Sequence, residues 1–295
     1  MISPKPLAPP LQINRWKNPS ARKAYRPQRK LMTIAIGFAY DGGLLLCADT
    51  KVSGAIKENQ SKIDVRTSNN GYCRIAFAMS AVDLNFPKSA VDKCWEHVQQ
   101  NVDFATTHID EVVEAVEKSL ASFYEIYIYP HPDRQPNSPY LQFLVGIWLR
   151  DETRLYVSYE TLFRRVVEYE CIGSAAYLAK YLIRQYMKAN GGRWDYKDAE
   201  LMAEFTVGSA IEYDEACGGT PEILTITNDG TVTGPAPPGD ISFKFVDGIA
   251  NYIWQFHRNF IHSGDDRWSQ KALDSELKEL TEKIRKHHTS VWFNW

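Results

Sequence analysis

The sequence predicts an α+β fold in which two antiparallel sheets stack face to face and pairs of helices cover their outer faces. Short β-prone runs occur in three blocks, and two pairs of segments with helical periodicity separate these blocks. Several runs are apolar on both faces, which is typical of strands in a sheet that is covered on both sides. Strand blocks that alternate with helix pairs do not fit a doubly wound βαβ fold.

The first predicted element of the folded domain is a β-hairpin. Two apolar runs, 34–40 and 44–48, are joined by Asp41-Gly42-Gly43, and an Asp-Gly turn between β-prone runs is a strong hairpin signal. Thr33 stands at one end of this hairpin and Asp49 at the other. Because a hairpin brings its two ends together, we expect Thr33 and Asp49 to be neighbours.

The later elements follow from periodicity and turn signals, and the polar stretch 50–59 is expected to be irregular. The first sheet-and-helix block is completed by strands at 62–65 and 72–78, helices at 88–101 and 109–127, and a loop at 130–136. The second block has strands at 141–149, 155–159 and 166–172, helices at 175–187 and 197–211, a loop at 217–219, and strands at 222–227 and 231–233.

Segments on both sides of the predicted domain at 33–240 differ from it in composition. Residues 1–32 hold six prolines and eight Lys or Arg but no Asp or Glu, which predicts disorder. This stretch is a propeptide, a basic interaction arm, or the product of a start codon assigned upstream of Met32. Residues 241–295 are expected to form a helical extension that packs on the body or on a neighbouring subunit, with an apolar stripe of Leu273, Leu277, Leu280 and Ile284.

Composition excludes several classes of function. The net charge is −2, so the chain beyond the basic leader carries −10, which argues against nucleic-acid binding by the folded part. The five cysteines form no C-x-x-C pair, and the seven histidines show no ligand spacing, so we expect reduced thiols, no metal and no cofactor. No apolar run reaches the roughly 18 residues of a membrane span, and no secretory signal is visible. We therefore expect a cytoplasmic protein.

Thr33 is the candidate nucleophile. A threonine hydroxyl needs a nearby base, and one solution is its own α-amino group when the threonine is N-terminal. That amine has a pKa of about 8, so a useful fraction is neutral at pH 7. Removal of Met32 as an initiator methionine, or a processing event between Met32 and Thr33, would expose it.

The second strand of the hairpin and the residues after it carry a family resemblance. The run Leu45-Leu-Cys-Ala-Asp49-Thr-Lys51-Val-Ser53 resembles the start of proteasome β subunits and their bacterial relatives, which are N-terminal-nucleophile (Ntn) hydrolases of the threonine-protease type. In that family an aspartate lies sixteen residues after the N-terminal threonine, as Asp49 does after Thr33. Lys51 and Ser53 occupy places where the family usually has Arg and Thr.

Four further segments extend the resemblance over about residues 33–232. Lys62, in Ser-Lys-Ile, is similar to the catalytic lysine, and Ala78-Met79-Ser-Ala-Val-Asp resembles the strand end where the family has glycine in place of Met79. Cys171-Ile-Gly-Ser174 resembles the family's Gly-Ser-Gly, and Asp214-Glu-Ala-Cys217-Gly-Gly resembles its Asp-x-x-Ser-Gly-Gly loop, with cysteine replacing serine.

The resemblance implies a role for each residue. Thr33 Oγ would attack an amide carbonyl while its α-amino group takes and returns the proton. Lys62 would stay cationic beside Thr33, and Asp49 would hold Lys62. Ser174 and Asp214 would orient the α-amino group, with Cys217 as a thiol stand-in for the family's serine.

Three residues are implied to meet the substrate. The Met79 amide would stabilise the oxyanion, since any residue except proline supplies this donor. The backbone at Ser53 would align an extended peptide, and Lys51 lies in the same segment.

The resemblance implies a four-layer αββα Ntn-hydrolase fold. It also implies a threonine peptidase that forms a homo-oligomeric ring and acts on peptides or unfolded proteins. An unidentified ATP-dependent unfoldase is a candidate partner. One alternative is a noncatalytic ring subunit, which the leader, Met79 and Cys217 favour. Another is an Ntn amidase that acts on a small molecule. A third alternative is that the basic arm binds nucleic acid or a membrane surface, but its charges follow no interleaved pattern.

Overall fold

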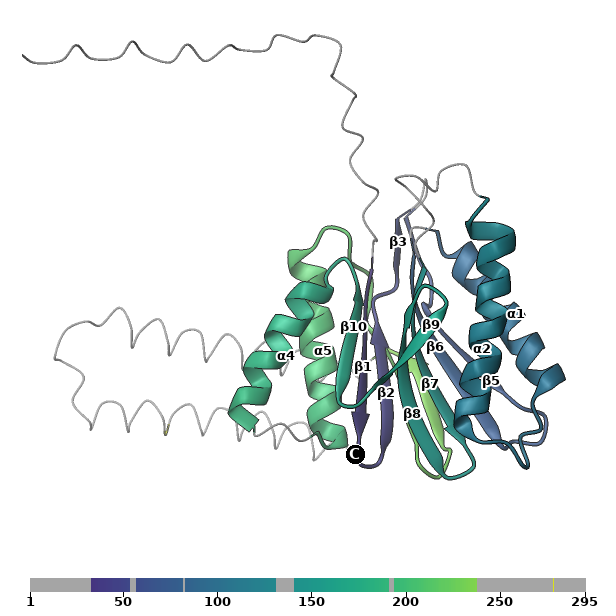
Figure 1. Cartoon of the computed structure of the whole chain (residues 1–295). Coiled ribbons are helices and arrows are strands. Elements are labelled where there is room, and N and C mark those ends of the chain that lie inside the picture. Colours follow the sequence, from purple (N-terminus) through teal and green to yellow (C-terminus); the bar gives the residue numbers. More distant parts are fainter. Residues whose placement is uncertain are drawn as a thin grey trace, which may run out of the picture.

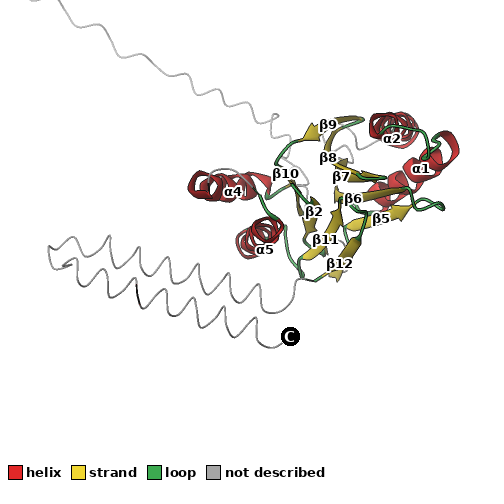
Figure 2. Cartoon of the chain, turned by 90° about the horizontal axis from the view of Figure 1, so that it is seen from below, coloured by secondary structure: helices red, strands yellow, loops and turns green. Residues whose placement is uncertain are grey.

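The computed structural model describes residues 33–53, 57–81, 83–130, 141–190 and 194–237, together with Lys278. The predictions for residues 1–32, for 241–295 apart from Lys278, and for most of the 130–136 loop lie outside the described residues. In the described part, two five-stranded antiparallel sheets lie face to face between two pairs of helices (Figure 1). The view along the strands in Figure 2 shows the four layers, which confirms the predicted α+β sandwich.

The first sheet has the strand order β10-β1-β2-β11-β12, so the predicted hairpin of β1 and β2 lies at its centre. Every residue of β2 is buried, as expected of an apolar strand with a neighbour on each side. The strands are β1 (Ile34–Tyr40), β2 (Gly43–Ala48), β10 (Tyr169–Gly173), β11 (Glu222–Thr227) and β12 (Val232–Ala236).

The second sheet has the order β5-β6-β7-β8-β9, in which each strand pairs with its neighbour along the chain. On β6, Phe77 and Met79 pack toward the helices, whereas Ala76 and Ala78 pack against the first sheet. This is the two-residue alternation of a strand that is covered on both faces. The strands are β5 (Ile63–Thr67), β6 (Cys73–Ala81), β7 (Leu141–Leu149), β8 (Glu152–Tyr159) and β9 (Leu162–Val166).

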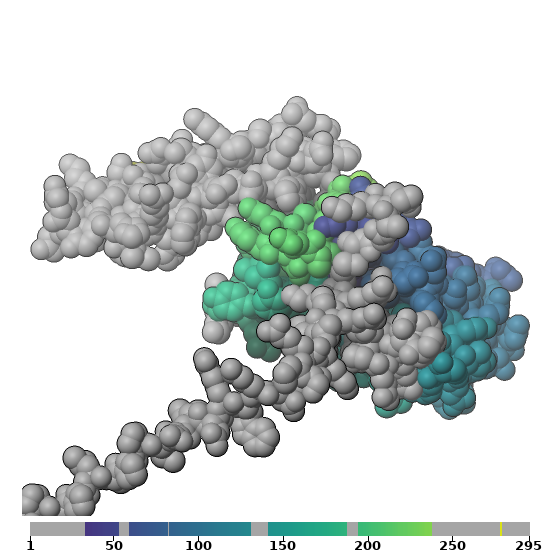
Figure 3. Space-filling view, turned by 90° about the horizontal axis from the view of Figure 1, so that it is seen from above, coloured from purple at the N-terminus to yellow at the C-terminus, as the bar shows by residue number. Residues whose placement is uncertain are grey.

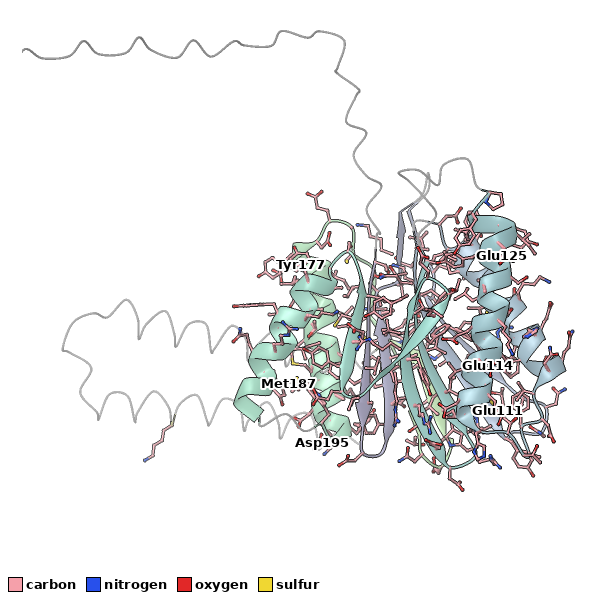
Figure 4. All side chains as sticks on the ribbon, viewed as in Figure 1. Glu111, Glu114, Glu125, Tyr177, Met187 and Asp195 are labelled. Carbon is pink, nitrogen blue, oxygen red and sulfur yellow. The ribbon has the colours of Figure 1, made fainter. Side chains whose placement is uncertain are left out.

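Two helix pairs form the outer layers. Helices α4 (Ala176–Asn190) and α5 (Tyr196–Tyr213) cover the first sheet, and α1 (Asn85–Asn101) and α2 (Ile109–Phe123) cover the second (Figure 1). The exposed Tyr177 marks the outer layer on α4, and Glu111 lies toward the opposite end of α2 from Glu125 (Figure 4). None of the helices in the described part is long and apolar enough to cross a membrane.

Three local predictions were wrong. The predicted helix 109–127 changes to a π-helix, η2 (Tyr124–Ile128), where Tyr129 N donates to Tyr124 O. The predicted strand 166–172 is broken at 167–168, because β9 belongs to the second sheet and β10 to the first. The stretch 50–59 forms a small hairpin of β3 (Lys51–Ser53) and β4 (Lys57–Asn59), whose polar strands lack the alternation that identifies a half-buried strand.

Candidate active site

Three of the predicted residues meet at the end of the hairpin where β1 begins, next to β3 (Figure 1). Thr33 directly precedes β1, Asp49 directly follows β2, and Lys62 precedes β5 in the opposite sheet. All three side chains are buried, with exposed fractions of 1% for Thr33, 0% for Asp49 and 2% for Lys62. The site therefore lies between the two sheets, and each sheet contributes to it.

The hydroxyl of Thr33 lies between a cation and a carboxylate. Thr33 Oγ1 donates to Asp49 Oδ1 at 2.5 Å and accepts from Lys62 Nζ at 2.5 Å. Lys62 Nζ also donates to Asp49 Oδ1 at 2.7 Å, which makes a buried ion pair. Two backbone amides complete the carboxylate's bonds: Ile34 N donates to Oδ1 and Gly218 N to Oδ2, both at 3.0 Å. Asp49 is thus held from four directions.

The Lys62 ammonium has a perturbed pKa. Burial lowers it from its ordinary value, while the Asp49 carboxylate opposes this shift. A cation at hydrogen-bond distance from a hydroxyl stabilises the deprotonated form of that hydroxyl. The arrangement is therefore able to lower the energy of a threonine alkoxide in a site away from bulk water.

The backbone of Thr33 is held by Ser174, which directly follows β10. Ser174 donates to the Thr33 carbonyl twice, from its amide at 2.9 Å and from its hydroxyl at 3.3 Å. This approach needs glycine at position 173, where φ is +98° and an added Cβ would lie 2.2 Å from the Thr33 carbonyl oxygen. Gly173 therefore lets β10 come close enough to fix the nucleophile's main chain.

We predict that Gly173→Ala lowers the free energy of unfolding by about 2 kcal/mol or more, because positive φ and the Thr33 contact both disfavour a side chain. Urea denaturation followed by tryptophan fluorescence measures this change. Gly71→Ala is the matched control, because Gly71 also has a positive φ of +73° but nothing lies within 4 Å of its added Cβ. If the two variants lost the same stability, the contact with Thr33 would contribute nothing.

Asp214 and Cys217 lie together in the loop after α5. Asp214 ends α5, its carboxylate accepts from Ala216 N at 2.9 Å, and its carbonyl accepts from Cys217 N at 2.8 Å. The Cys217 thiol is buried and hydrogen-bonded to the Ser174 side chain. Burial, together with the Asp49 and Asp214 carboxylates, raises the pKa of this thiol to about 12, so it is neutral at pH 7.

Lys51 ties β3 to that loop. Its Nζ donates to the carbonyls of Glu215 at 2.6 Å and Cys217 at 3.1 Å, and its amide donates to Gly218 O at 2.9 Å. Seen from above in Figure 3, purple atoms of the N-terminal strands adjoin green atoms of the later chain. Ser53 is the last residue of β3, and its backbone pairs with Lys57.

Met79 occupies the place where the proteasome β-subunit family has glycine, and two observations describe it. Its side chain is fully buried in the cluster between the second sheet and its helices. Its amide, the predicted oxyanion donor, donates to the Lys62 carbonyl at 2.9 Å. This amide therefore already has an acceptor in the structure.

Two contributors were missed by sequence reasoning. The Gly218 amide binds Asp49, but a backbone donor leaves no signal beyond the Gly-Gly pair already noted. Gln142 Oε1 accepts from Gly173 N at 3.1 Å, which links β7 to β10. A lone polar amide in the apolar run 141–149 is a signal that would have identified Gln142. In the described part of the chain, no group of three or more His, Cys, Asp or Glu is placed to hold a metal ion.

No protein-family model matches the sequence, and no curated protein matches it by sequence. Solved structures are similar in fold. Anbu from Hyphomicrobium sp. strain MC1 has a TM-score of 0.62 and 16% identity, over 80% of this chain and 100% of that one. Anbu (ancestral β-subunit) from Yersinia bercovieri has a TM-score of 0.62 and 11% identity, over 76% and 97%.

A third similar structure is the helical assembly of the Anbu complex from Pseudomonas aeruginosa, with a TM-score of 0.60 and 12% identity over 80% of this chain and 100% of that one. Identities this low establish likeness of fold alone. The likeness of fold extends over 97% of the Yersinia bercovieri chain and 100% of the other two. The chain therefore has the same fold as these Anbu structures.

Proposed function

We propose that the chain is a threonine-type peptidase whose nucleophile is Thr33 once its α-amino group is free. The observation that carries this proposal is the buried cluster in which the Thr33 hydroxyl contacts both Lys62 and Asp49. A buried ion pair contributes little to stability on balance, so stability alone does not explain its presence here. Ionisable groups with perturbed pKa values around a nucleophilic hydroxyl are characteristic of catalytic sites.

Each residue has a role in acyl transfer. Thr33 Oγ attacks the amide carbonyl, and the α-amino group of the same residue takes the proton and later gives it to the leaving amine. The Lys62 cation stabilises the developing alkoxide, and Asp49 holds Lys62 in place. Ser174 fixes the main chain of Thr33, while Asp214 and Cys217 form the loop beside it.

The substrate class and the assembly belong to the same proposal. An extended peptide or unfolded chain lies beside the β3 backbone at Ser53 as an added strand. Copies of the chain assemble into a ring in the cytoplasm, which restricts access to unfolded substrates supplied by an ATP-dependent unfoldase. The helical assembly described for the Pseudomonas aeruginosa Anbu complex supports self-association on this fold.

A comparison of two forms of the protein tests the proposal. The form that begins at Met32, from which initiator methionine removal exposes Thr33, is expected to hydrolyse fluorescein-labelled casein. A form that retains residues 1–32 behind an uncleavable Met32–Thr33 bond lacks the free amine and is expected to be inactive. Intact-mass measurement establishes the N-terminus of each form. Equal activity in both forms would exclude the α-amino group as the base.

The pH profile of hydrolysis is expected to be bell-shaped. Activity rises through a pKa of about 8 as the α-amino group becomes neutral. It falls again where Lys62 loses its proton, and because burial lowers the pKa of Lys62, this limb lies below the ordinary value of 10.5. Measurement of kcat from pH 6 to 11 tests the expectation. A profile that still rises at pH 11 would show that cationic Lys62 is not required.

The observations at Met79 favour a second candidate, a noncatalytic ring subunit with the same fold. A peptidase needs a donor for the oxyanion, and the Met79 amide is already bonded to Lys62 O. Intact mass discriminates the two candidates, because a chain that keeps residues 1–32 in its mature assembly has no free Thr33 amine.

A further inference from the structure

One buried hydroxyl on β6 has no hydrogen-bond partner among the described residues. Ser80, on β6, has an exposed fraction of 0%, and its Oγ makes no hydrogen bond. Buried polar groups in native proteins are nearly always paired, and an unpaired hydroxyl disfavours folding. An unpaired donor at this place therefore points to an acceptor that no described residue supplies.

The direction of this hydroxyl follows from the strand alternation. Phe77 and Met79 face the helices, while Ala76 and Ala78 face the first sheet. Ser80 is two residues after Ala78 in the same strand, so its side chain faces the gap between the two sheets.

The position of Ser80 along that gap is at the nucleophile. Ser80 pairs across the sheet with Gln142, whose Oε1 accepts from Gly173 N in the opposite sheet at 3.1 Å. Gly173 pairs with Ile34, and the next residue toward the end of the hairpin is Thr33. The strands that carry these residues, β6, β7, β10 and β1, lie together in the middle of the molecule (Figure 1). Ser80 thus stands at the level of the reacting hydroxyl.

The reaction needs a donor at this level. When Thr33 Oγ bonds to the carbonyl carbon, the π electron pair moves to the carbonyl oxygen, and preorganised donors stabilise the charge. The Met79 amide, the donor expected from the sequence, is bonded to Lys62 O at 2.9 Å. The adjacent Ser80 hydroxyl is buried, unpaired and aimed into the same gap.

We propose that the Ser80 hydroxyl is the oxyanion donor for acyl transfer to Thr33, in place of the Met79 amide. This inference rests on the proposed peptidase function. Ser80 donates a hydrogen bond and keeps its proton throughout. The proton from Thr33 Oγ goes to the α-amino group, and when the carbonyl re-forms and the C–N bond breaks, that proton goes to the leaving amine.

Ser80→Ala separates this role from a structural one. Removal of one oxyanion donor is expected to lower kcat about 100-fold or more with little change in KM. Because the hydroxyl is unpaired, its loss is expected to leave the thermal midpoint unchanged or raise it. Ser80→Cys keeps the size and a weak donor, so it is expected to recover part of kcat. Ser119→Ala, at a buried serine on α2, is the matched control for serine removal.

A transition-state analogue gives a second readout. A tripeptide boronate forms a tetrahedral adduct with Thr33 Oγ, whereas the carboxamide of the same peptide binds without one. Ser80→Ala is expected to weaken boronate binding about as much as it lowers kcat/KM, while carboxamide binding stays unchanged. An equal effect on both ligands would overturn the assignment, since it would indicate a change in the peptide site.

The outcomes distinguish this inference from the function on which it rests. A wild-type protein with free Thr33 that equals Thr33→Ala in casein hydrolysis overturns both. If wild type is active, Thr33→Ala is inactive and Ser80→Ala retains full kcat, only the role of Ser80 is overturned. A loss of kcat that parallels a fall in the thermal midpoint also overturns it, because the hydroxyl would then be structural.

Discussion

Replacement of Thr33 by alanine is expected to abolish peptide hydrolysis while the protein stays folded. Loss of a catalytic nucleophile lowers kcat by about 10⁴-fold or more. The variant removes a hydroxyl and a methyl group but leaves the Lys62–Asp49 ion pair and the amide bonds from Ile34 and Gly218 in place. The fold therefore keeps its main connections at the site, and the loss would come from the chemistry.

Release of fluorescein-labelled peptides from casein measures the loss, with each N-terminus verified by intact mass. Thr33→Ser retains the hydroxyl and is expected to keep measurable activity. Thr206→Ala is the control, because Thr206 is a fully buried threonine on α5 whose hydroxyl makes no hydrogen bond with any described residue. Activity in Thr33→Ala equal to wild type would contradict the mechanism.

Asp49→Ala has the largest expected effect on stability. It removes the acceptor of four donors: the Thr33 hydroxyl, the Lys62 ammonium and the amides of Ile34 and Gly218. Lys62 loses the carboxylate that it pairs with in the interior, and breaking such a buried ion pair lowers the free energy of unfolding by about 3–5 kcal/mol. Urea denaturation of the chain that begins at Met32 measures the change.

A second substitution tests the physical cause. Lys62→Met removes the buried charge, so Asp49→Ala combined with Lys62→Met is expected to be more stable than Asp49→Ala alone. Lys118→Ala breaks the exposed Glu114–Lys118 pair on α2 and is expected to leave the urea midpoint unchanged. If the double variant is as unstable as Asp49→Ala, the loss of stability comes from the broken amide hydrogen bonds and not from the buried charge of Lys62.

The parts of the fold that were predictable from sequence are those with strong local signals. The β1–β2 hairpin has apolar runs around an Asp-Gly turn, and the helices have apolar faces at the helical period. The three-residue strands β3 and β4 are polar and are defined by their pairing with each other. Their sequences do not show the alternation of apolar and polar residues that predicts a strand. The backbone hydrogen bonds of the π-helical turn η2 span one residue more than those of an α-helix. The spacing of apolar residues does not reveal so small a difference.

The site was predictable where a turn or a motif carried it. The hairpin alone makes Thr33 and Asp49 neighbours, and the resemblance added Lys62, which comes from the other sheet. Gly218 and Gln142 act through contacts with residues far away in sequence, which no local pattern encodes. The hydrogen bond from the Met79 amide to Lys62 O was also not predictable from the sequence, because it depends on the register between two strands.

The position of β1 and β2 at the centre of their sheet has a kinetic consequence. The two strands are flanked by β10 and β11, which the ribosome makes more than a hundred residues later. The hydrogen bond from Ser174 to the Thr33 carbonyl joins residues 141 positions apart in the sequence. The hydrogen bond from the Gly218 amide to the Asp49 carboxylate joins residues 169 positions apart. Contacts between such distant residues form late in folding. A nascent or half-folded chain therefore holds an unassembled nucleophile, and the reactive centre is completed only when the whole domain has closed around it.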